Sequence, residues 1–122
     1  MILADTSVWV DHLRSENAEM RKLLDHGQIA MHPFIVGELA LGSLKERAKT
    51  LAFLDLLPRV RVAQLNEVRQ MIEARSLYSV GIGLTDAHLI ASVYINPSTL
   101  LWTRDKRLRG VAESLGIHVN LP

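Results

Sequence analysis

The 122-residue chain contains no cysteine. Disulfide bonds and zinc sites built from thiolates are therefore excluded, and a reducing, cytoplasmic location is expected. No apolar run approaches the roughly 18 residues that a membrane-spanning helix needs. A basic segment is missing before the first apolar run, and Asp5 interrupts that run at once. We therefore expect neither a membrane span nor a signal peptide.

Internal repeats, low-complexity tracts and linkers are also missing, and the seven glycines and four prolines are scattered along the chain. One domain over residues 1–122 is the simplest prediction. Hydrophobic residues make up 48% of the chain, which is enough for one core, and charged residues make up an ordinary 22%. This composition excludes a disordered chain.

Short apolar runs alternate with longer segments of helical periodicity. The predicted strands cover residues 1–4, 28–31, 59–62, 99–102 and 117–119. The predicted helices cover residues 8–13, 17–25, 34–44, 45–57, 66–77, 85–95 and 106–115. The helix over 34–44 is almost wholly apolar, so it is expected to be buried. Strands separated by helices predict an α/β fold whose sheet is mostly parallel and covered by helices on both faces.

Four acidic residues stand out because of their positions. Asp5 directly follows the first predicted strand, Asp105 follows the fourth, and Asp86 opens the helix over 85–95. Glu38 lies inside the helix that is predicted to be buried. Ligands of such folds bind outside the carboxyl ends of the strands, so we expect these acids to meet there.

Each acid also has a purely structural interpretation. The three aspartates stand where an Asp side chain caps a helix N-terminus. Glu38 could be neutralised by an arginine, since buried charges are normally paired.

Taken together, the four acids favour a metal site. Clustered carboxylates repel one another unless a cation lies among them, and hard oxygen ligands favour Mg²⁺ or Mn²⁺ over zinc. One or two such ions can activate a water and stabilise charge on a phosphate. Thr6, Ser7 and Thr103 add hydroxyl groups beside the acids, although these residues are also common helix caps.

These residues carry a resemblance to a known family. The motif segments are Ile2–Ser7, Glu38–Gly42, Leu84–Ala91 and Leu101–Asp105. In their order and spacing the chain resembles PIN-domain ribonucleases, in particular the VapC toxins of bacterial toxin–antitoxin pairs, over essentially its whole length. Two departures are His88, where related sequences often carry an aliphatic residue, and Arg104 before the last acid.

The resemblance implies a three-layer α/β/α sandwich and cleavage of RNA by a Mg²⁺- or Mn²⁺-dependent endonuclease. The family's acidic quartet, which is catalytic and metal-binding, matches Asp5, Glu38, Asp86 and Asp105. Asp5 and Asp86 match its direct ligands, while Ser7 and Thr103 match its supporting polar positions. The family also implies a homodimer and a small antitoxin protein that inserts a basic side chain into the acidic site.

The remaining charge suits a nucleic-acid substrate. With the four acids set aside, fourteen basic residues face nine acidic ones, a balance of +5. The densest basic stretch consists of Arg104, Lys106, Arg107 and Arg109, which we expect to contact the RNA backbone. A solvated helix start is the alternative, but cations are disfavoured at a helix N-terminus.

Several other residues have competing interpretations. Trp9 and Trp102 could stack on bases but lie in apolar runs, which favours core positions. His88 could be a general base or a partly buried histidine, and no His-Glu-x-x-His motif indicates zinc. Surplus apolar residues predict a dimer or antitoxin interface, namely Met20, Leu23, Leu24, Leu51, Phe53, Leu54, Leu56 and Leu57.

Two other function classes remain open at this stage. A phosphoryl-transfer or receiver-type domain is disfavoured, because Ser7 stands where a phosphatase motif carries its second Asp and Asp55 lies in a helical pattern. The alternative is a catalytically silent RNA- or protein-binding domain of the same fold. An intact set of four acids argues against loss of activity.

Overall fold

A computed structural model of the protein describes residues 1–122. At its centre is a parallel three-stranded sheet in the order β2-β1-β3. The strands are β1 (Ile2–Ala4), β2 (Ile29–Ala30) and β3 (Leu100–Trp102). Leu3 of β1 pairs with Ala30 on one side and Leu101 on the other. The terminal run of the chain is therefore the middle strand, which explains its uninterrupted apolar character.

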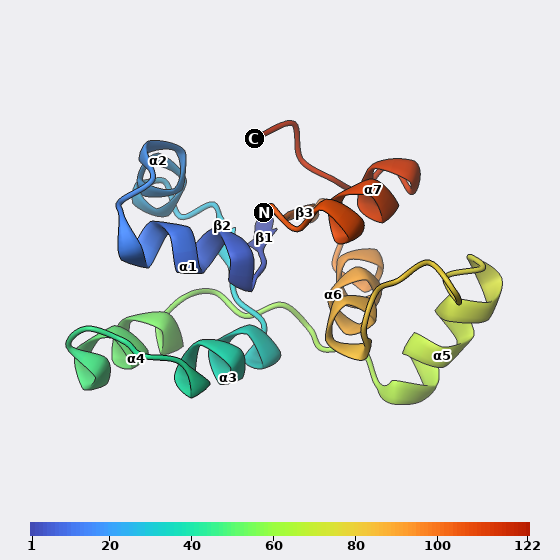
Figure 1. Cartoon of the computed structure of the whole chain (residues 1–122), viewed down its shortest axis with the longest axis horizontal. Helices are drawn as coiled ribbons and strands as arrows, with labels where there is room; N and C mark the ends of the chain where they lie inside the picture. Colours follow the sequence, from blue (N-terminus) through green and yellow to red (C-terminus); the bar gives the residue numbers. More distant parts are fainter.

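Seven helices connect and flank the strands: α1 (Thr6–Arg14), α2 (Ala18–Asp25), α3 (Pro33–Leu41), α4 (Arg47–Asp55), α5 (Leu65–Ala74), α6 (Leu84–Ile95) and α7 (Lys106–Ser114). All seven were predicted, with ends that differ by a few residues. Figure 1 shows them arranged around the short sheet. None is long and apolar enough to cross a membrane.

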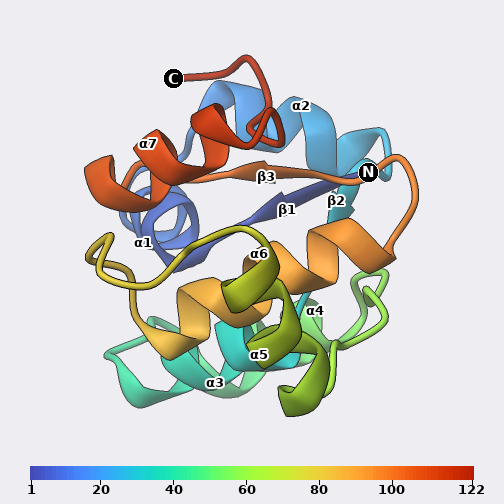
Figure 2. The same cartoon turned by 90° about the vertical axis from the view of Figure 1, so that its right-hand side faces the viewer.

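The layers confirm the predicted α/β/α sandwich. In Figure 2, α2 and α7 lie above the sheet, whereas α6, α3, α4 and α5 lie below it. The ends of β1 and β3 and the starts of α6 and α7 lie at the same end of the molecule. Residues that follow β1 and β3 or open α6 and α7 are therefore brought together at the carboxyl end of the sheet.

Two of the five predicted strands are reduced to single bridges. Arg59 bridges to Met31, and His118 bridges to Leu101, both in parallel. Beyond Val60 the backbone of Arg61 is bound by a side chain: Asn96 Oδ1 accepts its N–H at 2.9 Å, and Asn96 Nδ2 donates to its carbonyl at 2.8 Å. The alternating Val and Arg residues therefore lie at the sheet edge but do not continue the ladder.

The prediction that the 34–44 helix is buried was wrong. Only Ile35 and Leu39 of α3 are buried, whereas Leu41 is 89% exposed and Glu38 is exposed. An apolar sequence does not fix which face is covered, because a three-layer fold this small has too few neighbouring elements to surround every helix.

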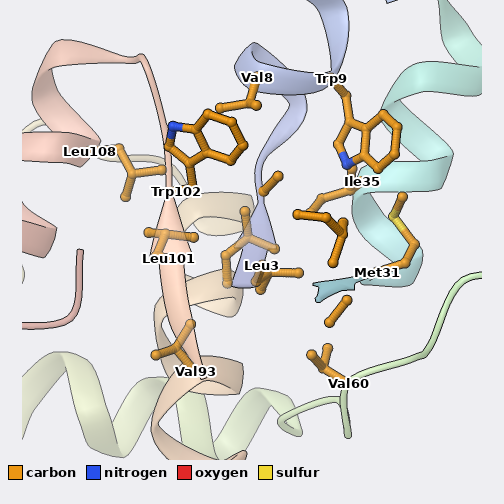
Figure 3. Close-up of a cluster of buried hydrophobic side chains, with 14 of the residues drawn as sticks. Leu3, Val8, Trp9, Met31, Ile35, Val60, Val93, Leu101, Trp102 and Leu108 are labelled. Atoms are coloured by element: carbon orange, nitrogen blue, oxygen red, sulfur yellow. The ribbon is translucent and has the colours of Figure 1, made fainter. Parts of the chain in front are cut away.

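The core lies on both faces of the sheet. Figure 3 shows Leu3 and Leu101 at its centre, with Trp102 near Val8 and Leu108. Both tryptophans, Trp9 and Trp102, are buried, which confirms the core interpretation. Of the apolar residues expected at an interface, Met20 and Leu54 are fully buried in the core, whereas Phe53 and Leu56 are 45% and 85% exposed.

Candidate active site

Asp5 occupies the end of β1 and caps α1. Its backbone N–H donates to the carbonyl of Trp102 at 2.9 Å, which continues the pairing with β3 by one residue. Its carboxylate accepts hydrogen bonds from the hydroxyls of Ser7 and Thr103, both at 2.5 Å, and from the Val8 N–H at 3.3 Å. Burial raises the pKa of Asp5, and these hydrogen bonds partly offset the rise.

Thr103 joins two of the predicted acids. Its hydroxyl donates to Asp5 and accepts the backbone N–H of Asp105 at 3.1 Å. The Thr103 side chain is fully buried, and its own N–H donates to Nε2 of His118 at 3.1 Å. The hydrogen bond to His118 therefore holds Thr103, the residue that connects Asp5 to Asp105, in place.

Asp105 is exposed and caps α7, accepting the Leu108 N–H at 3.0 Å. The capping interpretation is thus correct for Asp5 and Asp105, and it does not compete with a role in the site. A cap uses one carboxylate oxygen, and the second oxygen of Asp105 is free to face the cluster.

Glu38 differs from its expected environment. Its side chain is exposed, and its hydrogen-bond partner is the hydroxyl of Thr6, which donates at 2.6 Å, rather than an arginine. Thr6 is the first residue of α1 and follows Asp5 directly. The hydrogen bond therefore ties the middle of α3 to the end of β1.

Asp86 lies in the first turn of α6 and is half-buried. Burial raises its pKa, the Gly83 N–H opposes the rise, and the negative charges of Asp105, Asp5 and Glu38 raise it further. The four acids thus share one electrostatic environment. They come from the end of β1, the middle of α3 and the starts of α6 and α7.

The donor set suits a hard divalent cation, because its carboxylates repel one another without one and its hydroxyls add further hard oxygen atoms. No group of three or more acidic or histidine side chains is arranged to hold an ion by itself. Mg²⁺ in proteins is usually bound through one or two carboxylates and keeps several waters, which the arrangement of these acids allows.

The four basic residues near the site have different neighbours. Arg104 pairs with Asp11 at 2.5 Å, and Arg109 pairs with Glu113 at 3.6 Å. Lys106 and Arg107 are exposed and form no ion pair. Two of the four cations are therefore partly neutralised inside the chain.

Asp11 is a neighbour of the site that the sequence patterns did not identify. It lies four residues after Ser7 on α1, so the two side chains share a helix face. Ser7 Oγ also accepts the Arg104 N–H at 2.9 Å, which places Arg104 at the rim of the site. The helical spacing from Ser7 was the signal that could have identified Asp11.

His88 is buried and packs in an aromatic cluster whose central ring, that of Phe34, is 40% exposed. Its ring centroid is 4.7 Å from that of Phe34, which is 5.1 Å from that of His32. Burial lowers the pKa of His32 to about 4, and the neighbouring His88 and Arg59 add to the effect. Nδ1 of His88 is buried without a partner. These contacts match the partly buried histidine and give no support to a general base.

Comparisons with known proteins agree on one family. The PIN domain family matches residues 2–114. Ribonuclease VapC32 of Mycobacterium tuberculosis is 41% identical to the chain over 117 residues, in both the CDC 1551 / Oshkosh strain and the H37Rv strain. The alignment covers 96% of this chain and 94% of each relative.

Proposed function

Because the chain belongs to the PIN-domain family as a VapC-type ribonuclease, we propose that it is a toxin that cleaves RNA internally with the help of Mg²⁺ or Mn²⁺. The proposed reaction is hydrolysis of a phosphodiester bond by a nuclease domain that spans residues 1–122. The observation that carries this proposal is the shared environment of Asp5, Glu38, Asp86 and Asp105 at the carboxyl end of a parallel sheet.

The residues have distinct proposed roles. Asp5 and Asp86, the two more enclosed acids, would hold the cation directly, while Glu38 and Asp105 would act through its water shell. A bound divalent ion supplies Lewis acidity toward water and offsets charge on the phosphate. Ser7 and Thr103 orient the Asp5 carboxylate and favour its charged form, and Thr6 orients Glu38.

The basic stretch would contact the RNA backbone beside the acids. Lys106 and Arg107 are the better candidates, since Arg104 and Arg109 already have acidic partners. These contacts would position the strand without selecting its sequence.

We also propose two protein partners. A small cognate antitoxin would inhibit the nuclease, and a basic side chain of it entering the acidic site would suit the charge found there. A second copy of the chain would cover exposed apolar residues of α3, of α4 and of the residue that follows α4, namely Leu41, Phe53 and Leu56. Light scattering of the free protein tests the homodimer.

The central experiment is cleavage of a mixed cellular RNA pool by antitoxin-free protein. The arms contain Mg²⁺, Mn²⁺ or a chelator, with Asp5→Asn as the inactive control and Glu73→Gln, an acid on the exposed surface of α5, as the matched control. We expect discrete fragments that vanish with chelator and with Asp5→Asn but persist with Glu73→Gln.

A folded, cation-loaded protein that cleaves nothing in the pool would contradict the proposal. It would favour the alternative of a catalytically silent binding domain. Full activity of both Asp5→Asn and Asp86→Asn would instead refute the assignment of the site while leaving the nuclease activity in place.

A further inference from the structure

A pocket of about 600 Å³ opens directly beside Glu38. It lies between α1, α3 and the segment that connects α3 to α4. Glu38 and Leu39 form the wall from α3, and Val10, Leu13 and Arg14 form the wall from α1. The pocket therefore borders the acidic cluster at Glu38, the member of that cluster that lies on α3.

We propose that this pocket binds the nucleotide next to the scissile phosphate of a single-stranded RNA. The inference rests on the proposed function, because it locates a subsite of the same active site. The volume falls in the range of pockets that enclose small ligands, so a nucleoside fits within it.

The lining has the chemistry that a nucleotide needs. Val10, Leu13 and Leu44 supply apolar surface against which a base can pack. Arg14 and Lys45 supply two positive charges for phosphate oxygens, while the acids of the lining are Glu38, which belongs to the acidic cluster, and Glu46, which pairs with Lys49 at 3.8 Å. Apolar contact with bases combined with cations along the backbone is typical of proteins that bind single-stranded nucleic acid.

The far wall of the pocket is the connection between α3 and α4, and hydrogen bonds within the chain hold it in place. The Arg47 guanidinium donates to the carbonyls of Ala40 at 2.5 Å and Gly42 at 3.2 Å. The Thr50 hydroxyl donates to the carbonyl of Lys45 at 2.9 Å. These bonds fix the connection between α3 and α4, so the pocket is formed before a ligand arrives and binding costs little ordering.

Continuity with the acids favours RNA over a protein segment as the occupant. The Thr6 hydroxyl fixes Glu38 between the acidic cluster and the pocket. A strand whose phosphate lies among the acids must place a neighbouring nucleotide on one side or the other of Glu38. The pocket offers that nucleotide an apolar wall for its base and the cations Arg14 and Lys45 for its phosphate.

The test fills the pocket and measures cleavage kinetics. Val10→Trp places a large side chain in it, and Lys45→Glu reverses a cation at its rim. Val62→Trp is the matched control. Val62 is 39% exposed, close to the 38% of Val10, but it does not line the pocket. The substrates are short RNAs that contain a mapped cleavage site and differ only in the bases that flank it.

We expect Val10→Trp and Lys45→Glu each to raise KM about tenfold, the effect of losing one base or phosphate contact. The kcat should change much less, because the acids are untouched. Val10→Trp should also flatten any preference among flanking bases, and Val62→Trp should match the wild type in both respects. Equal thermal unfolding temperatures establish that the variants are folded.

An unchanged KM and unchanged flanking preference in both Val10→Trp and Lys45→Glu would overturn the subsite. If the same variants instead lose binding to a co-expressed antitoxin, the pocket belongs to the protein partner and the subsite is again overturned. A wild-type protein that cleaves no RNA in the pool refutes the proposed function itself. These outcomes are distinguishable because the first two require an active wild-type enzyme.

Discussion

The side chain of Arg107 lies directly against Gly81. A β-carbon at Gly81 would collide with the Arg107 guanidinium and would come within 2.9 Å of Arg107 Cδ. Gly81 also has a φ of +85°, a backbone conformation that residues with a side chain rarely adopt. The contact joins the loop before α6 to the first turn of α7, and therefore joins the segment that leads to Asp86 with the helix that Asp105 caps.

Gly81→Ala should therefore destabilise the fold by about 1–2 kcal/mol from backbone strain, with a further cost from displacing Arg107. Gly110→Ala is the matched control, because Gly110 lies inside α7 with open space around its Cα. That change should stabilise the protein by about 0.5–1 kcal/mol. Urea denaturation measures the free energy of unfolding of both variants. Adding Arg107→Ala to Gly81→Ala should recover only the stability that is lost to the collision with Arg107, not the part that is lost to backbone strain. A Gly81→Ala protein as stable as the wild type would show that the loop can rearrange freely.

Thr103→Val should shift the pH dependence of cleavage. The Thr103 hydroxyl stabilises the charged carboxylate of Asp5, so its loss raises the pKa of Asp5 further. If cleavage requires ionised Asp5, the acid limb of the pH–rate profile moves to higher pH. Loss of the hydroxyl also removes the acceptor of the Asp105 N–H, a hydrogen bond worth about 0.5–1.5 kcal/mol. Thr99→Val is the control, since Thr99 is also buried but lies outside this network.

Asp86→Asn should make the metal-free protein more stable at neutral pH. The folded state raises the pKa of Asp86 above 3.8, so ionising this group destabilises the fold. That penalty is absent below the unfolded pKa and complete above the raised folded pKa. The stability difference between Asp86→Asn and wild type should therefore grow as the pH rises through this window. Denaturation in chelator at several pH values measures it, and a difference that shrinks with rising pH would contradict the sign.

Mg²⁺ or Mn²⁺ should raise the thermal unfolding temperature of the wild type. An ion that binds only the folded state adds about 2.7 kcal/mol at a concentration 100 times its Kd. Asp5→Asn and Asp86→Asn should reduce the shift, while Glu73→Gln should retain it. Potassium chloride at matched ionic strength separates site binding from screening. Equal shifts in all four proteins would locate the ion elsewhere.

Asp11→Asn should strengthen RNA binding at low salt. Asp11 partly neutralises Arg104 at the rim of the site, and its removal leaves one more positive charge facing the substrate. We expect KM to fall with little change in kcat, and the salt dependence of KM to become steeper. Asp25→Asn, which alters a surface pair on α2, should leave KM unchanged. A higher KM for Asp11→Asn would show that the pair holds Arg104 in its binding position.

Local sequence patterns predicted most of this molecule because they act over short distances. The apolar run over residues 1–4 predicted the central strand, and the acids after strands or at helix starts indicated where the candidate site lies. Asp5 and Asp105 do cap helices, as their positions also indicated. Both roles follow from the place of a short carboxylate at the end of a strand.

Tertiary structure alone decided the contacts between distant segments. The same apolar helix that predicted a buried Glu38 leaves it exposed, bound to Thr6 and bordering a pocket. Residues 59–62 alternate like a strand, but the Asn96 side chain takes the backbone hydrogen bonds of Arg61 that would continue the ladder. Periodicity specifies which residues share a face, whereas burial depends on which element covers that face. That choice is made only when strands and helices far apart in the chain pack together.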